Sequence, residues 1–289
     1  MRYVGRIFRP PSEAHSLIVQ STIGCSHNKC DFCDMYKEKL FRIREIQSVL
    51  DDLTEARQKY RSVWRIFIAD GDALVRTTED WIKILEHIRA FFPECERVSS
   101  YGTPRSVLNK SNEDLELLHS LGLYMIYMGL ESGSDAVLES INKGETVDEI
   151  VDAGIKIKES GIKASVTVIS GLGGTGLWED HAIKTSKALS LIKPDYIGLL
   201  TLMLVEGTPL YERNARGEFE VPNPMEIAAE TLLMLSNIDS EGSVFRSNHA
   251  SNYLSLGGTL NKDIETMKTV LKEALEGKVV YKNEWLRGL

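Results

Sequence analysis

Three cysteines stand close together near the start of the chain and could bind a metal centre. Cys25, Cys30 and Cys33 fall within the segment 24–33, which reads GCSHNKCDFC. Thiolates at such close spacing are typical ligands of an iron-sulfur cluster. Three protein thiolates leave one iron of a 4Fe-4S cluster open for a small molecule to chelate. The segment therefore predicts a catalytic cluster.

A structural zinc site is the alternative for the same segment. His27 could complete a closed set of four ligands with the three cysteines. Such sites usually combine a Cys-x-x-Cys with a second ligand pair far along the chain, and the sequence offers no evident second pair. The remaining cysteine, Cys95, stands alone between a predicted helix and a predicted strand, and is interpreted as structural or free.

The composition is that of an ordinary globular protein. Of 289 residues, 43% are hydrophobic and 26% are charged, which fits one large α/β unit or two smaller domains. The formal charge of -8 opposes broad attachment to phosphate backbones, so nucleic acid is not an expected partner. Four cysteines, three of them clustered, make a poor disulfide framework. No apolar run approaches a membrane span and residues 1–11 lack a secretory signal, so a cytoplasmic location without membrane contact is expected.

Short apolar runs alternate with segments of helical period, which is the pattern of repeated βα units around a parallel sheet. Strands are predicted at 17–22, 63–69, 97–101, 124–130, 164–170 and 196–204. Helices are predicted at 43–60, 81–92, 112–121, 146–160, 179–192, 225–237 and 261–276. The pattern predicts an α/β fold, a partial (β/α)6 TIM-like barrel over residues 1–210 with a C-terminal helical extension at 211–289 packed on it. In such barrels the active site lies at the carboxyl ends of the strands.

Four segments at predicted strand ends occur in an order typical of one enzyme superfamily. They are the cysteine segment 24–33, ADGD at 69–72, MGLESG at 128–133 and ISGLGG at 169–174. With these segments the chain resembles the radical S-adenosylmethionine (radical SAM) superfamily over residues 17–210. The resemblance is strongest to the branch containing tRNA methylthiotransferases, the Elongator catalytic subunit and oxygen-independent coproporphyrinogen oxidases. One feature differs, since four residues separate Cys25 from Cys30 where the superfamily commonly has three.

The resemblance implies a 4Fe-4S cluster bound by the three clustered cysteines, with SAM bound beside it. The positions that it assigns to SAM are Phe32, Asp70, Gly71, Asp72, Glu131, Ser132, Lys143, Thr167 and Gly171. Phe32 is expected beside the adenine, Glu131 at the ribose hydroxyls and Lys143 at the methionyl carboxylate. The plain alternatives are core packing for Phe32, helix capping for Glu131 and an exposed position for Lys143.

The resemblance also implies chemistry. Members of the superfamily cleave SAM reductively to a 5′-deoxyadenosyl radical, which abstracts hydrogen from a substrate, and the electron comes from an external donor such as a flavodoxin or ferredoxin. Because the chain is acidic and has no second cysteine set, a small molecule is the preferred substrate. A tRNA- or peptide-modifying enzyme is the alternative within this class. A zinc-stabilised protein or an iron-sulfur carrier without catalysis is the alternative outside it.

Substrate contacts are expected from polar residues after the later strands. The candidates are Tyr101, Arg105, Glu206, Arg246, Asn248 and His249. The last three belong to a polar stretch, 245–253, whose side chains could instead cap strand or helix ends.

Overall fold

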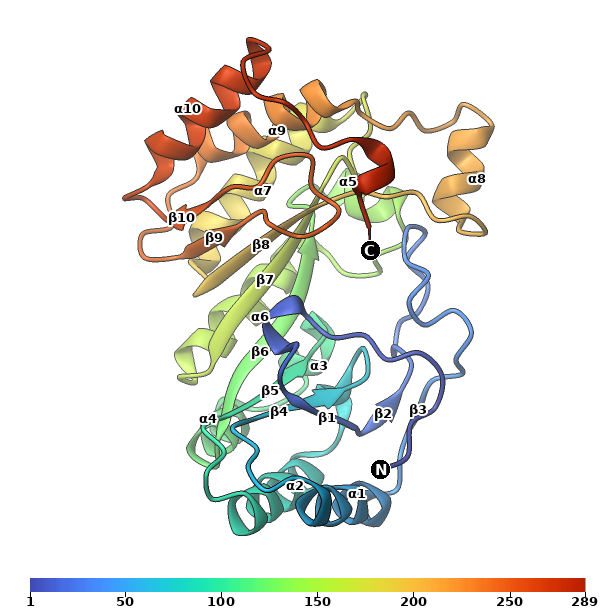
Figure 1. Cartoon of the computed structure of the whole chain (residues 1–289), viewed down its shortest axis with the longest axis vertical. Coiled ribbons are helices and arrows are strands. Elements are labelled where there is room, and N and C mark those ends of the chain that lie inside the picture. The colour runs from blue at the N-terminus through green and yellow to red at the C-terminus, as the bar shows by residue number, and fades with distance from the viewer. Residues whose placement is uncertain (289) are drawn as a thin grey trace. The chain divides into compact units, whose positions relative to one another are not determined.

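The protein is an α/β protein with a mostly parallel sheet, as the computed structural model shows for residues 1–288 (Figure 1). Eight strands follow the order β1-β4-β5-β6-β7-β8-β9-β10, and β2 pairs with β3 in a separate two-stranded sheet. The chain groups into two compact units. The first unit holds residues 1–28, 33–128 and 156–164, and the second holds 29–32, 129–155 and the chain from Ser165 onward.

The first unit contains the start of the parallel sheet. Its strands are β1 (Leu17–Gln20), β4 (Arg65–Ala69), β5 (Arg97–Tyr101) and most of β6 (Leu123–Glu131). Its small antiparallel sheet consists of β2 (Thr22–Ile23) and β3 (Arg42–Ile43). Its helices are α1 (Ile46–Lys59), α2 (Thr78–Phe91), α3 (Pro104–Leu108) and α4 (Asn112–Ser120). Helix α2 packs against both α1 and α4.

Local sequence signals explain where these helices begin and which face they bury. Helix α2 begins where the Thr77 side chain accepts a hydrogen bond from the Asp80 N–H. Capping boxes at Thr103 and Ser111 start α3 and α4 in a similar way. The residues that α2 buries recur at helical spacing and form one apolar stripe: Trp81, Ile84, Leu85 and Ile88.

Phe67 is the centre of an aromatic contact in the core of the first unit. Its fully buried ring meets the rings of Tyr101 and Tyr127 edge-on, with centroids 5.0 and 6.0 Å away. The Tyr127 hydroxyl donates a hydrogen bond to the buried Glu13 carboxylate at 2.6 Å. The contact therefore joins β4, β5 and β6 to the segment that precedes β1.

The second unit contains the rest of the sheet. It holds β8 (Tyr196–Thr201), β9 (Val244–Arg246) and most of β7 (Lys163–Ser170), which run parallel to one another. Strand β10 (Gly257–Thr259) runs antiparallel to β9. The helices of this unit are α5 (Asp135–Ser140), most of α6 (Val147–Glu159), α7 (Trp178–Ile192), α8 (Pro209–Ala215), α9 (Pro224–Asn237) and α10 (Ile264–Leu275). Helix α9 packs against both α7 and α10 (Figure 1).

The six predicted strands and the α/β class are confirmed, with β1 and β4 to β8 as the six. The last of them ends at Thr201, three residues before the predicted end at 204. The segment 211–289, predicted to be helical, also contains β9 and β10, so that prediction was incomplete. Each is three residues long and β10 includes two glycines, which leaves no strand pattern to detect. The domain boundary at residue 210 stays a prediction. Within residues 1–288, no helix combines the length and apolarity that a membrane span requires.

Replacing Phe67 by alanine is expected to lower the free energy of unfolding by about 3–5 kcal/mol, because a buried ring is lost and a cavity remains. Phe91, which is 38% exposed at the end of α2, provides the control, and Phe91→Ala should cost much less. Urea unfolding followed by circular dichroism measures both values. Equal losses in the two variants would contradict the central place of Phe67 in the core.

Candidate active site

Two of the three clustered cysteines, Cys25 and Cys33, belong to the first unit and lie near the side chain of Tyr36. Tyr36 is a buried residue, and burial is the main reason that its pKa is raised far above the usual value. Nearby Tyr101, Asp70, Cys25 and Cys33 raise this pKa further. Tyr36 therefore stays a neutral hydroxyl beside the cysteines.

The third cysteine, Cys30, lies in the short segment 29–32, which belongs to the second unit. Its neighbour Asp31 holds this segment there. The Asp31 N–H donates to the Ile141 carbonyl at 2.8 Å, and the Asn142 side chain donates to the Asp31 carboxylate at 2.9 Å. Phe32 packs against an apolar cluster of this unit that includes Ile141, so its core-packing role is confirmed.

The structure does not by itself form a closed metal site. Within residues 1–288, no three His, Cys, Asp or Glu side chains gather in a way that would hold a metal ion. The assignment of Cys25, Cys30 and Cys33 as cluster ligands therefore stays a prediction.

Asp70, at the carboxyl end of β4, anchors the start of the cysteine segment. It is fully buried, and its Oδ2 accepts hydrogen bonds from the Gln20 amide at 2.7 Å and from the Gly24 N–H at 3.0 Å. The same oxygen forms an ion pair with the buried Lys39 ammonium at 2.9 Å. The Oδ1 atom is buried and lacks a hydrogen-bond partner among the described residues. One oxygen of the carboxylate is thus fully used by the protein, and the other keeps unused hydrogen-bonding capacity.

Gly71 allows the chain after β4 to approach the cysteine segment closely. Its N–H donates to the Gly24 carbonyl at 3.2 Å. A Cβ atom here would lie 2.6 Å from Cε2 of Tyr36 and 3.0 Å from Cβ of Cys25, which is too close for any larger residue. The requirement for glycine is therefore steric at this position.

Asp72 joins three segments of the first unit through its carboxylate. Its Oδ2 accepts from the Ser26 hydroxyl at 2.5 Å and from the Thr103 hydroxyl at 3.1 Å. Its Oδ1 accepts from the Ser106 hydroxyl at 2.8 Å. The carboxylate thereby connects the cysteine segment to the start of α3. Arg105, a predicted substrate residue on α3, has an exposed side chain.

Glu131 and Lys143 form an ion pair in the second unit. The Lys143 ammonium lies 3.4 Å from Glu131 Oε1, and its side chain is only 11% exposed. The interpretation of Lys143 as an exposed lysine is therefore wrong. Burial raises the pKa of Glu131, and the charge of Lys143 opposes that rise. Glu131 has a positive φ of 60°, and its buried Oε2 lacks a hydrogen-bond partner among the described residues.

Gly129 makes room for the Glu131 carboxylate. A Cβ atom at Gly129 would fall 1.9 Å from Glu131 Oε1, so a larger residue would displace the carboxylate. In the first unit the Asp70 Oδ1 acceptor and the neutral Tyr36 phenol are polar groups of the kind that an amino or hydroxyl group needs, and in the second unit the Glu131 Oε2 acceptor is another. Each unit by itself therefore carries polar groups that fit a cofactor such as SAM.

The loop after β7 is held by a buried carboxyl group on α9. Glu230 accepts hydrogen bonds from the Ser170 hydroxyl and, at 3.0 Å, from the Gly171 N–H. Gly171 has a positive φ of 90°, which favours glycine. Thr167, another predicted SAM residue, lies three residues before the end of β7 and is half-buried beside Gly198.

His181 on α7 extends this buried contact to the loop after β6. Its Nδ1 lies 2.8 Å from the Ser132 hydroxyl, and its Nε2 lies 3.6 Å from the Glu230 carboxyl. Burial raises the pKa of Glu230 to about 7 and lowers the pKa of His181 to about 4. These side chains thus join two loops to which the sequence resemblance assigns SAM contacts. The contacts run from Ser132 through His181 and Glu230 to the Gly171 N–H. Sequence reasoning missed both ionisable members because they occupy ordinary buried positions on helices.

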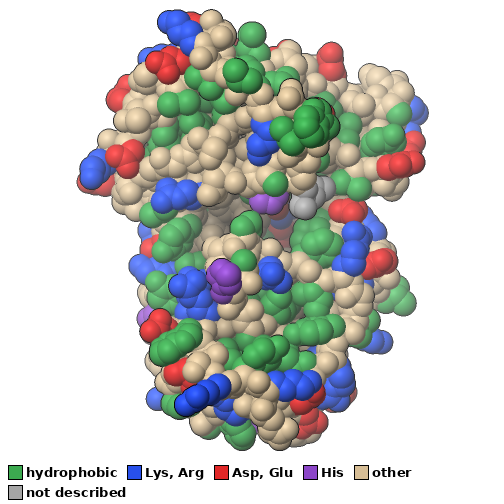
Figure 2. Space-filling view, in the orientation of Figure 1, with side chains coloured by type: hydrophobic (Ala, Val, Ile, Leu, Met, Phe, Trp, Pro, Cys, Tyr) green, Lys and Arg blue, Asp and Glu red, His purple; other side chains and the backbone are tan. Residues whose placement is uncertain are grey.

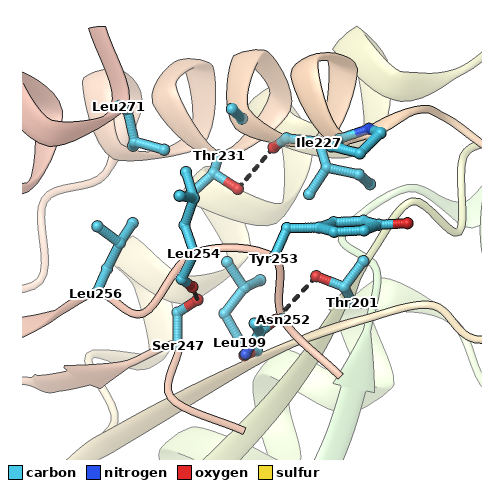
Figure 3. Close-up of a pocket in the computed structure, with 12 residues that line it drawn as sticks. Leu199, Thr201, Ile227, Thr231, Ser247, Asn252, Tyr253, Leu254, Leu256 and Leu271 are labelled. Carbon is cyan, nitrogen blue, oxygen red and sulfur yellow. Dashed lines mark hydrogen bonds between the residues drawn. The ribbon is translucent and has the colours of Figure 1, made fainter. Parts of the chain in front are cut away.

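Two residues of the polar stretch 245–253, Ser251 and Asn252, cap the end of β8, as the alternative interpretation of this stretch predicted. The Thr201 hydroxyl donates to the Asn252 side chain at 2.8 Å, and Asn252 donates to the Leu199 carbonyl at 2.8 Å (Figure 3). The cavity that these residues line with α9 measures about 10 Å³, room for one water molecule.

The other predicted substrate residues are not brought into one cluster. Glu206, Arg246 and Asn248 are exposed, and His249 contacts the Ser251 hydroxyl at 2.9 Å. Tyr101 lies in the aromatic core contact with Phe67. Their roles toward a substrate stay predictions.

Replacing Glu230 by glutamine is expected to change stability in a pH-dependent way. The pKa of Glu230 rises from 4.5 in the unfolded chain to about 7, so the native protein holds a proton that the unfolded chain has lost, and its stability falls as pH rises through this range. Glutamine does not ionise, so the free energy of unfolding of the variant should rise relative to that of the wild type as the pH increases from about 5 to 8. The rise should be roughly 3 kcal/mol at most.

Urea unfolding at a series of pH values measures this difference. His181 is present in both proteins, so its own titration largely cancels in the comparison. Glu273→Gln, at an exposed position on α10, serves as the control and should show a flat difference. A flat difference for Glu230→Gln as well would show that this carboxyl titrates normally.

Comparisons with known proteins agree with the fold and the order of the motifs. The family model of the radical SAM superfamily matches residues 19–185. A tRNA uridine(34) acetyltransferase of Methanocaldococcus jannaschii is 28% identical over 127 residues, which are 44% of this chain and 23% of that protein. The chain thus spans about a quarter of the length of this curated relative.

Solved structures share the fold. The structure of Elp3 from Methanocaldococcus infernus superposes with a TM-score of 0.53 at 16% identity, over 91% of this chain and 63% of that one. Coproporphyrinogen III oxidase (HemN) from Escherichia coli, described as a radical SAM enzyme, gives a TM-score of 0.55 at 18% identity, over 76% of this chain and 52% of that one. The predicted partial barrel is therefore confirmed. Because the family match covers more than half of the chain, the protein belongs to the radical SAM superfamily, whose members are enzymes that bind a 4Fe-4S cluster and SAM.

Proposed function

We propose that this enzyme cleaves SAM reductively at a cluster held by Cys25, Cys30 and Cys33 and removes hydrogen from a small-molecule substrate. The observation that carries the proposal is the family match over residues 19–185, which includes all three cysteines and the segments 69–72, 128–133 and 169–174. When bound, the cluster and SAM supply the reducing electron and the hydrogen-abstracting radical.

The chain's own residues hold and orient the cofactor in this proposal. The ion pair of Asp70 with Lys39 fixes the position of the Gly24 N–H, and so the start of the cysteine segment. The neutral Tyr36 hydroxyl offers a donor on a ring that lies near Cys25, and the Asp70 Oδ1 atom offers an acceptor. In the second unit, Glu131 offers its free carboxylate oxygen while Lys143 balances its charge.

Radical SAM enzymes take their electron from an external donor. Cys95 is the one cysteine outside the cluster segment, so the sequence supplies no second set of thiolates for an auxiliary cluster. Burial raises the pKa of Cys95, which keeps it a protonated thiol. We propose a flavodoxin or ferredoxin as the donor.

The preference for a small substrate is supported by charge. The chain carries a net charge of -8, and acidic side chains are interspersed with basic ones over the face drawn in Figure 2. Such a surface gives little of the electrostatic attraction that phosphate backbones require. A cytoplasmic location belongs to the same proposal.

Modification of tRNA is the second candidate, and the name of one relative supports it. The acetyltransferase relative is named for uridine 34 of tRNA, so the expectation that nucleic acid is not a partner lacks support from the relatives. That relative matches only 44% of this chain, over part of the shared superfamily core. The two substrates are distinguished by experiment below.

Replacing Cys30 by alanine is expected to abolish the formation of 5′-deoxyadenosine after anaerobic reconstitution with iron and sulfide. The variant removes one of three ligands, so its bound iron should fall as well. Cys95→Ala is the matched control and should keep both properties. Dithionite and SAM start the reaction, and chromatography measures the product. Normal cleavage by Cys30→Ala would contradict the ligand assignment.

Deuterium transfer into 5′-deoxyadenosine should identify the substrate pool. The enzyme is incubated with fractions of a deuterium-labelled cell extract, separated by dialysis and treated or not with ribonuclease. The dialysable fraction is expected to transfer label whether or not it has met ribonuclease. Transfer only from the retained fraction, lost after ribonuclease treatment, would refute the small-molecule proposal and establish RNA as the substrate.

A further inference from the structure

A cavity of about 180 Å³ opens in the first unit beside the start of α2. It is lined by residues that follow β4 and by residues of α3 and the turn after it. Its polar lining consists of Arg76, Thr77, Thr78, Ser106, Asn109 and Lys110. We call it the basic cavity because it contains two cations and its lining includes no carboxylate.

Arg76 is a buried cation in the lining of the basic cavity and has an unused donor. Its side chain is 1% exposed. One terminal nitrogen donates to the carbonyls of Ser21 and Arg44, both at 2.8 Å, and the other pairs with Asp80 at 2.8 Å. Its Nε is buried and has no hydrogen-bond partner among the described residues. An orphaned guanidinium N–H is costly unless a ligand accepts from it.

Lys110 is a second buried cation in the same cavity. The residue is 7% exposed, and its ammonium donates to the Arg76 carbonyl at 2.7 Å. Among the ion pairs of residues 1–288 none includes Lys110, so its nearest partner is a neutral oxygen. Burial lowers the pKa of Lys110, while the charges of Asp114, Asp72 and Glu79 oppose that effect from outside the lining. A bound anion would offset the cost of burying this charge.

The mouth of the basic cavity adds neutral donors. Thr77 and Asn109 are exposed, and Thr78 is half-buried at the first position of α2. The backbone N–H groups and the dipole at the start of a 14-residue helix favour negative charge. A tetrahedral anion that enters from the mouth would thus meet hydroxyl, amide and helix-end donors before it reaches the two cations.

The basic cavity is also connected to the cysteine segment. Ser106 lines the cavity and donates to Asp72 at 2.8 Å. Asp72 in turn accepts from Ser26, which directly follows Cys25. Two hydrogen bonds therefore separate the cavity lining from the segment that is proposed to hold the cluster.

From this geometry we infer that the basic cavity binds a terminal phosphate group carried by the substrate. A phosphate monoester presents several oxygens to the donors of Arg76, Lys110 and the start of α2. A phosphodiester within an RNA backbone is chained on both sides, which makes it a poorer fit for a cavity that buries its cations. The inference rests on the proposed function only in taking the phosphate to be part of the substrate, since binding is measured without turnover.

Isothermal titration calorimetry of the folded protein with inorganic phosphate and with ribose 5-phosphate tests the inference. Wild type is expected to bind each at one saturable site. Lys110→Gln removes the buried charge, and Asn109→Asp places a carboxylate at the exposed mouth. Each should weaken phosphate binding at least tenfold. Lys83→Gln removes the same charge from an exposed position on α2 and should change binding less than twofold.

Three outcomes would overturn the inference: no saturable phosphate binding by wild type, unchanged binding by both Lys110→Gln and Asn109→Asp, or displacement of phosphate by RNA with hydroxyl ends as effectively as by ribose 5-phosphate. Asn109 is exposed, so Asn109→Asp keeps the test valid if Lys110→Gln folds poorly. Failure of SAM cleavage with intact phosphate binding would refute the proposed function alone, and the reverse result would refute this inference alone.

Discussion

The part of the candidate site that lies in the first unit depends on one buried carboxylate, that of Asp70. Asp70 lies at the end of β4, yet it bonds to Gln20 on β1, to Gly24 before the first cysteine and to the ammonium of Lys39 beyond the third. A buried charge is tolerated only when it is paired and fully hydrogen-bonded on at least one side. The strand end and both sides of the cysteine segment are therefore held by the same group, and displacement of Lys39 would leave the buried Asp70 charge unpaired.

Much of the regular part of the fold could be predicted from periodicity together with turn and cap signals. β5 was predicted at its observed bounds, and α4 and α9 within one residue. The two helices combine an apolar stripe with a cap, Ser111 or Asn223. β9 and β10 were missed because a segment of three residues is too short to show an alternating apolar pattern. β9 is a strand because it pairs with β8, and β10 because it pairs with β9. Tertiary context determines such strands.

The candidate site was only partly predictable. The motif segments led correctly to the strand ends, where Asp70, Glu131 and Gly171 are found. The residues that hold these segments were not predicted, because Lys39 and Glu230 approach them from distant parts of the sequence. The polar stretch after residue 245 attracted attention by its composition, whereas two of its residues, Ser251 and Asn252, bond to the backbone of β8. Composition identifies polar groups and does not reveal which of them are already bonded.

The close approach at Gly71 has a consequence for how this enzyme can diverge. The space that a side chain would need is occupied by the ring of Tyr36 and by Cys25. If the cysteine is retained, only the ring can yield. In related proteins, a residue larger than glycine at the position of Gly71 should therefore be found only together with a residue smaller than tyrosine at the position of Tyr36. The two positions would then be inherited as a pair.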